Sequence, residues 1–236
     1  MGPQPLSNVR RKAVPRFGTK YLLEKPAQAA LVMAQIALAA ETERYWVWVI
    51  SDMYPKSERR AAAAMYQAVT GGEGRRSALT AVGEAKLTGE RLAMFKAAEK
   101  LWKPVRNRRN DFAHHLWGAT DDLPKDLLLM DPKDNTDDRI SLFEETDRVI
   151  KQREAGKKPR QLPLHKFYNA KNIQVWTPDA LLNEVEQAGL ACQFVFDLCL
   201  AVREGPRGRT RRKLRLHPNV KVEMAVLGIR PSSRSK

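Results

Sequence analysis

Seven residues with chemically useful side chains lie close together between residues 106 and 118. They are Arg106, Arg108, Arg109, Asn110, Asp111, His114 and His115. On a helix that turns by ~100° per residue, Arg106, Asn110 and His114 lie four residues apart and form one polar stripe. Phe112 and Leu116 lie toward the other side and are expected to anchor this helix in a core. The spacing therefore predicts a helix with one chemically active face.

These residue types suit chemistry on a phosphodiester. A histidine can move a proton at neutral pH. An arginine can hold a phosphate through two parallel hydrogen bonds and stabilise the charge that develops on it, and an asparagine can orient either group. No metal is required when the attacking group is the 2′-hydroxyl of RNA itself. A structural interpretation fits the same residues, because Arg and His side chains late in a helix also pair with carboxylates of a neighbouring helix.

The run Arg109-Asn110-Asp111-Phe112-Ala113-His114 resembles the R-x4-H signature, commonly R-N-x-x-A-H, of the HEPN domains (higher eukaryotes and prokaryotes nucleotide-binding). The resemblance implies an all-α bundle that carries the motif on a late helix. It also implies a metal-independent endoribonuclease of a toxin or phage-defence type, in which two copies face each other and form one composite site. A subgroup of the family has a tyrosine two residues after the histidine, and here that position is Leu116.

The resemblance assigns roles to individual residues. Arg109, Asn110 and His114 are the expected catalytic residues, with His114 as general acid or base, Arg109 stabilising the phosphate and Asn110 orienting both. The neighbouring side chains of Arg106, Arg108 and His115 are expected to bind the substrate. No cofactor and no metal are expected.

The elements that must position these residues are mostly helical. Apolar spacing, caps and breakers predict helices over residues 26–54, 57–72, 75–85, 88–118, 136–156 and 178–203. Pro104 is expected to kink or restart the fourth of them. Leu127–Met130, between two prolines, predicts a short strand that residues 173–176 pair with as a hairpin. The predicted fold is an all-α bundle of about five or six helices with a small hairpin-like or irregular insertion and basic terminal extensions.

The formal net charge of +15 is concentrated at the two ends of the chain. Residues 1–25 hold six basic residues and one acid, and residues 203–236 hold eleven basic residues and two acids. The expected organisation is a basic N-terminal arm (1–25), a HEPN-like helical bundle (26–203, with 119–176 as an insertion) and a basic C-terminal tail (204–236). Basic ends attract RNA or DNA. The alternatives are solvated extensions or, for the tail, inclusion in the fold through the apolar run Val220–Ile229.

Cys192 and Cys199 lie seven residues apart in a predicted helix, with Cα atoms ~10 Å apart, which is too far for a disulfide. Read as buried apolar residues, they fit a reducing compartment. The four histidines form no metal-ligand spacing with them. The N-terminus lacks the apolar region of a secretory signal, and the apolar stretch Ala29–Ala40 is too short to span a bilayer. We therefore expect a cytoplasmic protein with no membrane partner.

Two function classes remain. The first is a metal-independent endoribonuclease that cleaves RNA by 2′-hydroxyl attack in a composite dimer site. The second is a non-catalytic RNA- or DNA-binding or adaptor protein, in which the same helix serves dimerisation. The expected partners are RNA or DNA through the basic termini, a second copy of the chain and, for a toxin, an antitoxin protein. The aromatic run Tyr45–Ile50 is interpreted as core or as a homodimer interface.

Overall fold

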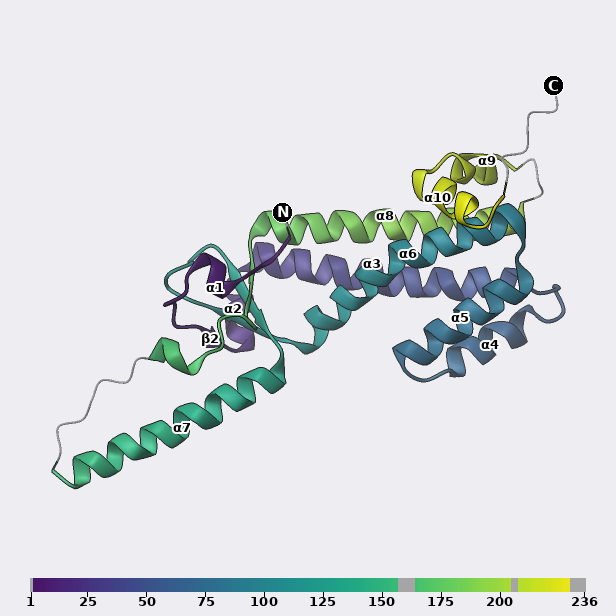
Figure 1. The fold of residues 1–236 in the computed structure, drawn as a ribbon. Coiled ribbons are helices and arrows are strands. Elements are labelled where there is room, and N and C mark those ends of the chain that lie inside the picture. Colours follow the sequence, from purple (N-terminus) through teal and green to yellow (C-terminus); the bar gives the residue numbers. More distant parts are fainter. Residues whose placement is uncertain (1, 157–163, 205–207, 230–236) are drawn as a thin grey trace. The chain divides into compact units, whose positions relative to one another are not determined.

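A computed structural model describes residues 2–156, 164–204 and 208–229 (Figure 1). The fold is mostly α, as predicted. The helices in this part of the chain are α1 (Leu6–Val9), α2 (Thr19–Leu23), α3 (Pro26–Asp52), α4 (Arg59–Ala68), α5 (Gly72–Lys86), α6 (Gly89–His114), α7 (Pro132–Glu154), the 3-10 helix η1 (Leu164–Phe167), α8 (Pro178–Arg203), α9 (Arg209–Arg215) and α10 (Pro218–Val226). The strands are β1 (Gln4–Pro5), β2 (Arg16–Phe17), β3 (Leu116–Ala119), β4 (Leu127–Met130) and β5 (Gln174–Trp176). Helices α3 to α8 correspond to the six predicted ones.

The chain forms two compact units. The first contains residues 1–36 and 108–186, and the second contains residues 37–107 and 187–236. Helices α3, α6 and α8 each contribute one part to either unit, because the unit boundaries fall within them. The expected bundle over residues 26–203 is therefore not a single unit.

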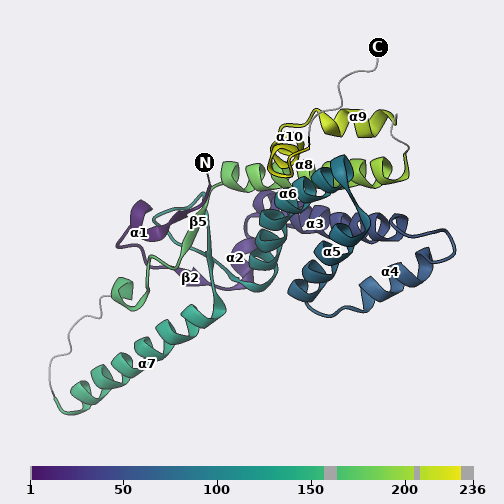
Figure 2. The same ribbon diagram turned by 45° about the vertical axis from the view of Figure 1, so that its right-hand side comes forward.

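The first unit is built around a five-stranded antiparallel sheet with the order β1-β5-β4-β3-β2. Figure 2 labels two of its strands, β2 and β5. The predicted pairing is correct, since Leu127 lies opposite Trp176 and Leu128 opposite Val175. The sheet is larger than a hairpin because two short strands from the N-terminal segment pair at its edges.

The central strand β4 is buried on both faces. Because side chains alternate along a strand, Leu127 and Leu129 pack into one apolar cluster, while Leu128 and Met130 pack into another. The first cluster includes Phe112 of α6, so the sheet fixes the end of the helix that carries the motif.

The N-terminal segment differs from the expected arm. Residues 4–23 form β1, α1, β2 and α2, and Leu6 is buried beneath the sheet. Two of its arginines are paired with acids of the loop after β3: Arg10 Nε lies 3.3 Å from Asp122 Oδ1, and Arg16 pairs with Asp121. Two of the six basic residues among residues 1–25 therefore form ion pairs within the unit.

The C-terminal segment also differs from the expected tail. Helices α9 and α10 insert Leu214, Val220 and Met224 into the core of the second unit. The alternative in which the run Val220–Ile229 belongs to the fold is thus the one that the structure supports. Trp46 of the aromatic run is buried in the same core, so this part of the run is core rather than interface.

Several basic residues near the C-terminus lie in ion pairs of the second unit. The paired acids are largely buried: Asp52 pairs with Arg203, Asp197 with Lys213 at 2.7 Å, and Glu90 with Arg211 at 3.4 Å. Glu223 of α10 is itself buried and pairs with Lys100. The Asp52–Arg203 pair joins α3 to α8, whereas the other three pairs connect α9 and α10 to α6 and α8.

Helix α6 passes through Pro104 without a break, so the helix does not restart there, which was one of the two predicted alternatives. Proline removes one backbone hydrogen bond at a cost of ~3 kcal/mol. Trp102 and Val105, on either side of it, are both buried, and the burial of two large side chains offsets that cost. The helix ends at His114 rather than at Gly118, because Leu116–Ala119 pairs with β4 as strand β3.

Helix α8 alone among the described helices has the length and mean hydropathy, 1.4 over an 18-residue window, to cross a membrane. Just over half of that window, 56%, is buried inside the protein. Its buried residues Val195 and Leu198 belong to the core of the second unit. A buried core helix of a soluble protein has the same properties.

Candidate functional site at the end of helix α6

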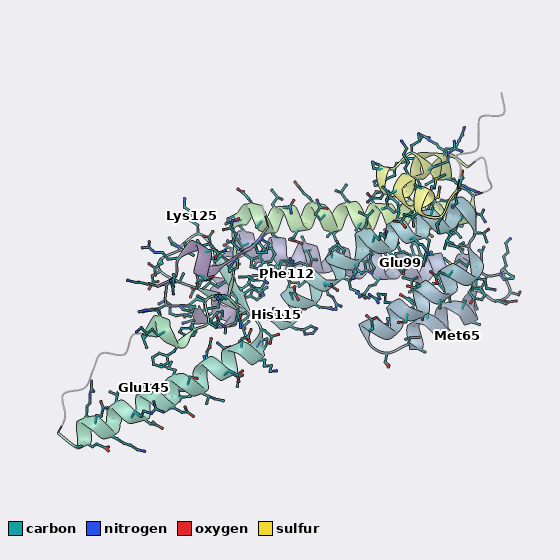
Figure 3. The ribbon with its side chains drawn as sticks, in the orientation of Figure 1. Met65, Glu99, Phe112, His115, Lys125 and Glu145 are labelled. Carbon is teal, nitrogen blue, oxygen red and sulfur yellow. The ribbon has the colours of Figure 1, made fainter. Side chains whose placement is uncertain are left out.

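Phe112 anchors the last turn of α6. Its ring lies 5.3 Å from the ring of Trp117 and 5.0 Å from that of Trp176, and the Trp117 indole donates a hydrogen bond to the Phe112 carbonyl oxygen at 3.2 Å. Figure 3 shows Phe112 and His115 at the end of α6, where the chain leads into the sheet. The aromatic cluster fixes the rotation of the helix and hence the face that each following side chain takes.

Arg108 has partners on three sides. Its Nη1 lies 3.2 Å from Asp111 Oδ2, its Nε lies 3.5 Å from Glu184 Oε1, and its guanidinium carbon lies 4.7 Å from the centre of the Trp176 ring. An arginine between two carboxylates and an aromatic face is held by charge and by cation–π attraction. Arg108 therefore joins α6, β5 and the start of α8 within the first unit.

His115 lies between two carboxylates. Its Nε2 is 3.9 Å from Asp111 Oδ1 and 3.8 Å from Asp131 Oδ2. Asp131 also caps α7, because its side chain accepts a hydrogen bond from the backbone N–H of Lys133 at 2.8 Å. His115 is thus positioned to connect the end of α6 to the beginning of α7.

The motif residues Arg109, Asn110, Ala113 and His114 occupy a different face of α6. Asn110, Ala113 and His114 are exposed, and Arg109 is half-buried. Arg109 Nη1 donates to Asn110 Oδ1 at 3.1 Å, while its Nε is shielded from solvent and has no hydrogen-bond partner among the described residues. In the described part of the chain, no hydrogen bond or ion pair engages the His114 side chain.

The structure divides the predicted site into two groups. Arg109 and Asn110 are in contact, and Asn110 and His114 lie one turn apart on the same exposed face. Arg108 and His115, predicted to bind substrate, are instead engaged with carboxylates of their own unit. Arg106 lies on the stretch of α6 that belongs to the second unit, where it donates to the Gly72 carbonyl oxygen at 3.1 Å.

Three residues of this cluster were not predicted from the sequence. The partner Asp131 carried a local signal, since an aspartate before a proline is a typical helix start. The other two, Trp176 and Glu184, lie more than sixty residues away from α6 and had no signal in the local sequence.

Among the described residues, no group of three or more His, Cys, Asp or Glu side chains is arranged to hold a metal ion. The arrangement at the end of α6 offers a guanidinium, an amide and an imidazole on one exposed surface. Such a surface can bind a phosphate and exchange a proton with a group beside it.

No family model matches this sequence, and neither the curated proteins nor the solved structures contain a match.

Proposed function

We propose that this protein is a metal-independent endoribonuclease of the HEPN type. The observation that carries the proposal is the division of charged residues on α6. Asn110, Ala113 and His114 of the R-N-x-x-A-H pattern lie on an exposed face beside the half-buried Arg109. The charged residues before, between and after them, Arg108, Asp111 and His115, are engaged in internal pairs. The side chains of Asn110 and His114 are therefore accessible to a substrate.

The proposed reaction is attack of an RNA 2′-oxygen on the adjacent phosphorus. The bond from phosphorus to the 5′-oxygen breaks, and the products are a 2′,3′-cyclic phosphate and a 5′-hydroxyl end. His114 takes the proton from the 2′-hydroxyl or gives one to the leaving 5′-oxygen. Arg109 binds the phosphate oxygens and stabilises their additional charge, and Asn110 holds the Arg109 side chain toward them.

One copy of this face supplies a single histidine, whereas the reaction uses both a base and an acid. A second copy of α6 facing the first would provide the other group, as the resemblance to HEPN domains implies. The toxin or phage-defence setting, an antitoxin partner and a cytoplasmic location belong to the same proposal.

The proposal is tested with single-stranded RNA and purified protein in the presence of EDTA. We expect cleavage that leaves 2′,3′-cyclic phosphate ends, and we expect His114→Ala and Arg109→Ala each to reduce its rate at least about a hundredfold. Both variants should melt like the wild type, because the two side chains are not part of the core.

His115→Ala is the matched control, since it removes the neighbouring histidine from the internal cluster. It should retain cleavage. If His114→Ala cleaves as well as the wild type, the catalytic assignment is wrong. If no preparation cleaves RNA but the protein shifts it in a gel, the chain is a non-catalytic binding protein instead.

The composite site has its own test. Adding His114→Ala protein to the wild type at constant total concentration forms mixed dimers that hold a single His114. If two facing histidines are needed, cleavage should fall with roughly the square of the wild-type fraction, whereas a fall in simple proportion to that fraction would show that each copy acts alone.

A further inference from the structure

Helix α7 exposes three apolar side chains between residues 140 and 150, and the exposed Asp147 lies on the same side of the helix. Ile140, Phe143 and Ile150 are 52%, 62% and 47% exposed. Their spacing of three and seven residues places them within an arc of ~80° on a helix. Figure 1 and Figure 2 both show α7 leading away from the strands of its unit. An exposed apolar stripe on a helix of 23 residues is a candidate contact surface.

This stripe is distinct from the side of α7 that faces the rest of the unit. Asp138 accepts a hydrogen bond from the backbone N–H of Asn169 at 3.4 Å, and Leu142 and Val149 on the same side are half-buried. That side lies ~140° around the helix from the exposed stripe. The internal contacts of α7 therefore leave the stripe free.

The charges on α7 are strongly polarised. Residues 131–147 hold seven acidic and two basic residues, whereas residues 148–154 hold three basic residues and one acid. Two parallel copies would place like charges together, and two antiparallel copies would place the acidic part of one helix beside the basic end of the other. Antiparallel helix dipoles also attract.

We infer that α7 forms an antiparallel pair with α7 of a second copy of this chain. We choose the register in which Ile140 lies opposite Ile150 of the second copy, because it also brings opposite charges together. The same register places Asp137 near Lys151 of the second copy, and both are exposed and make no side-chain ion pair among the described residues. Asp147 then faces Phe143, whereas parallel pairing would bring two Asp147 side chains together.

The pairing does not depend on the proposed ribonuclease activity. In this register the two α7 N-termini are roughly 40 Å apart, since each lies ~13 residues from the two-fold axis at 1.5 Å per residue. His115, next to the motif histidine, contacts Asp131 at that end of α7. The α7 pair therefore keeps the two motifs apart, and a composite site would need a separate contact.

Analytical ultracentrifugation of the full chain over a range of concentrations tests the pairing. We expect self-association in the micromolar range, to a dimer if α7 is the only contact and to larger assemblies if the composite-site contact forms as well. Phe143→Glu should raise the dissociation constant of the α7 contact at least about tenfold, because it removes an apolar side chain and places a second carboxylate opposite Asp147. Met65→Glu is the control, since Met65 is 72% exposed on α4 in the second unit and should leave the equilibrium unchanged. A wild type that is monomeric at all concentrations, or a Phe143→Glu dimer of unchanged affinity, would overturn the inference.

A charge exchange tests the orientation of the helices. Asp137→Lys alone and Lys151→Glu alone should each weaken the dimer, because each creates two like-charge contacts. Mixing the two variants should restore it, since both contacts then join opposite charges. Failure to restore the dimer contradicts the proposed register. Ribonuclease activity of Phe143→Glu should equal that of the wild type, so that a failure of either proposal is recognised separately.

Discussion

Adjacent residues of α6 point in different directions, because one step along a helix turns the side chain by ~100°. Arg108 and His115 face the carboxylates and Trp176 of their own unit, while Arg109 and His114 face solvent or lie at its edge. This contrast gives two neighbouring arginines with different expected contributions to stability.

Arg108→Ala should lower the free energy of unfolding by about 1–3 kcal/mol, because Glu184 and Asp111 lose their cation and Trp176 loses a cation–π partner. Arg109→Ala should change it by less than about 0.5 kcal/mol, as is usual for surface substitutions. Urea unfolding of both variants measures the difference. Equal losses would show that Arg108 is not a structural residue.

Glu99 of α6 gives a prediction about pH. Burial raises the pKa of its carboxyl above the ordinary 4.5, although Thr80 donates a hydrogen bond to it. A carboxyl with a raised pKa in the folded state binds its proton more tightly there. It therefore adds to stability below pH 4.5, and this contribution is lost as the pH rises through the raised value.

Glu99→Gln keeps the acceptor for Thr80 but cannot ionise. The variant should equal or exceed the wild type in melting temperature at pH 7, and its advantage should shrink as the pH falls toward 4. Thermal melts across this range check the trend. An advantage that grows on acidification would contradict the assigned direction.

At the scale of elements, α10 provides a matched pair of valines. Val220 is fully buried against the core of the second unit, and Val226 is 71% exposed on the same helix. Val220→Ala should cost about 1–2 kcal/mol from lost apolar burial, and Val226→Ala should cost almost nothing. Similar melting temperatures for the two variants would show that α10 does not pack as described.

The six long helices, the strand β4 and its partner could be predicted because their signals are local. Leu127–Met130 is bounded by prolines, and Thr177 before Pro178 is a capping pattern; the Thr177 hydroxyl accepts from the Ala180 backbone N–H at 3.1 Å. The short elements at the ends could not be predicted, since β1 and β2 exist only through pairing with strands far along the chain.

In the site, too, the features with local sequence signals could be predicted, and those that depend on distant parts of the chain could not. The motif of six residues and its exposed face follow from the sequence and from helical geometry. The end of the helix does not, because the pairing of Leu116–Ala119 with β4 competes with helix formation there. The ion pairs of Arg108 depend on Glu184, which only the fold brings near.

At the scale of the whole molecule, the net charge of +15 does not show which basic side chains are available to bind a polyanion. Six of the seventeen basic residues near the two ends form ion pairs with acids from distant parts of the same unit. Contact with a polyanion must then come from basic side chains outside these pairs. Near the C-terminus these include Arg209, Arg212 and Lys221, which are exposed and make no side-chain ion pair among the described residues.

Replacing Arg209, Arg212 and Lys221 with glutamine should therefore change RNA binding without changing stability. Each phosphate contact on a single strand contributes ~0.7 to the slope of log affinity against log salt, so the slope should flatten by up to about 2. Replacing the paired set Arg203, Arg211 and Lys213 should instead lower the melting temperature, because Asp197 would lose its cation and Asp52 and Glu90 would each lose one of two. RNA binding at several salt concentrations, together with thermal melts, separates the two sets. If the first set leaves the slope unchanged, the C-terminal helices serve the core alone, and the RNA contact lies elsewhere on the molecule.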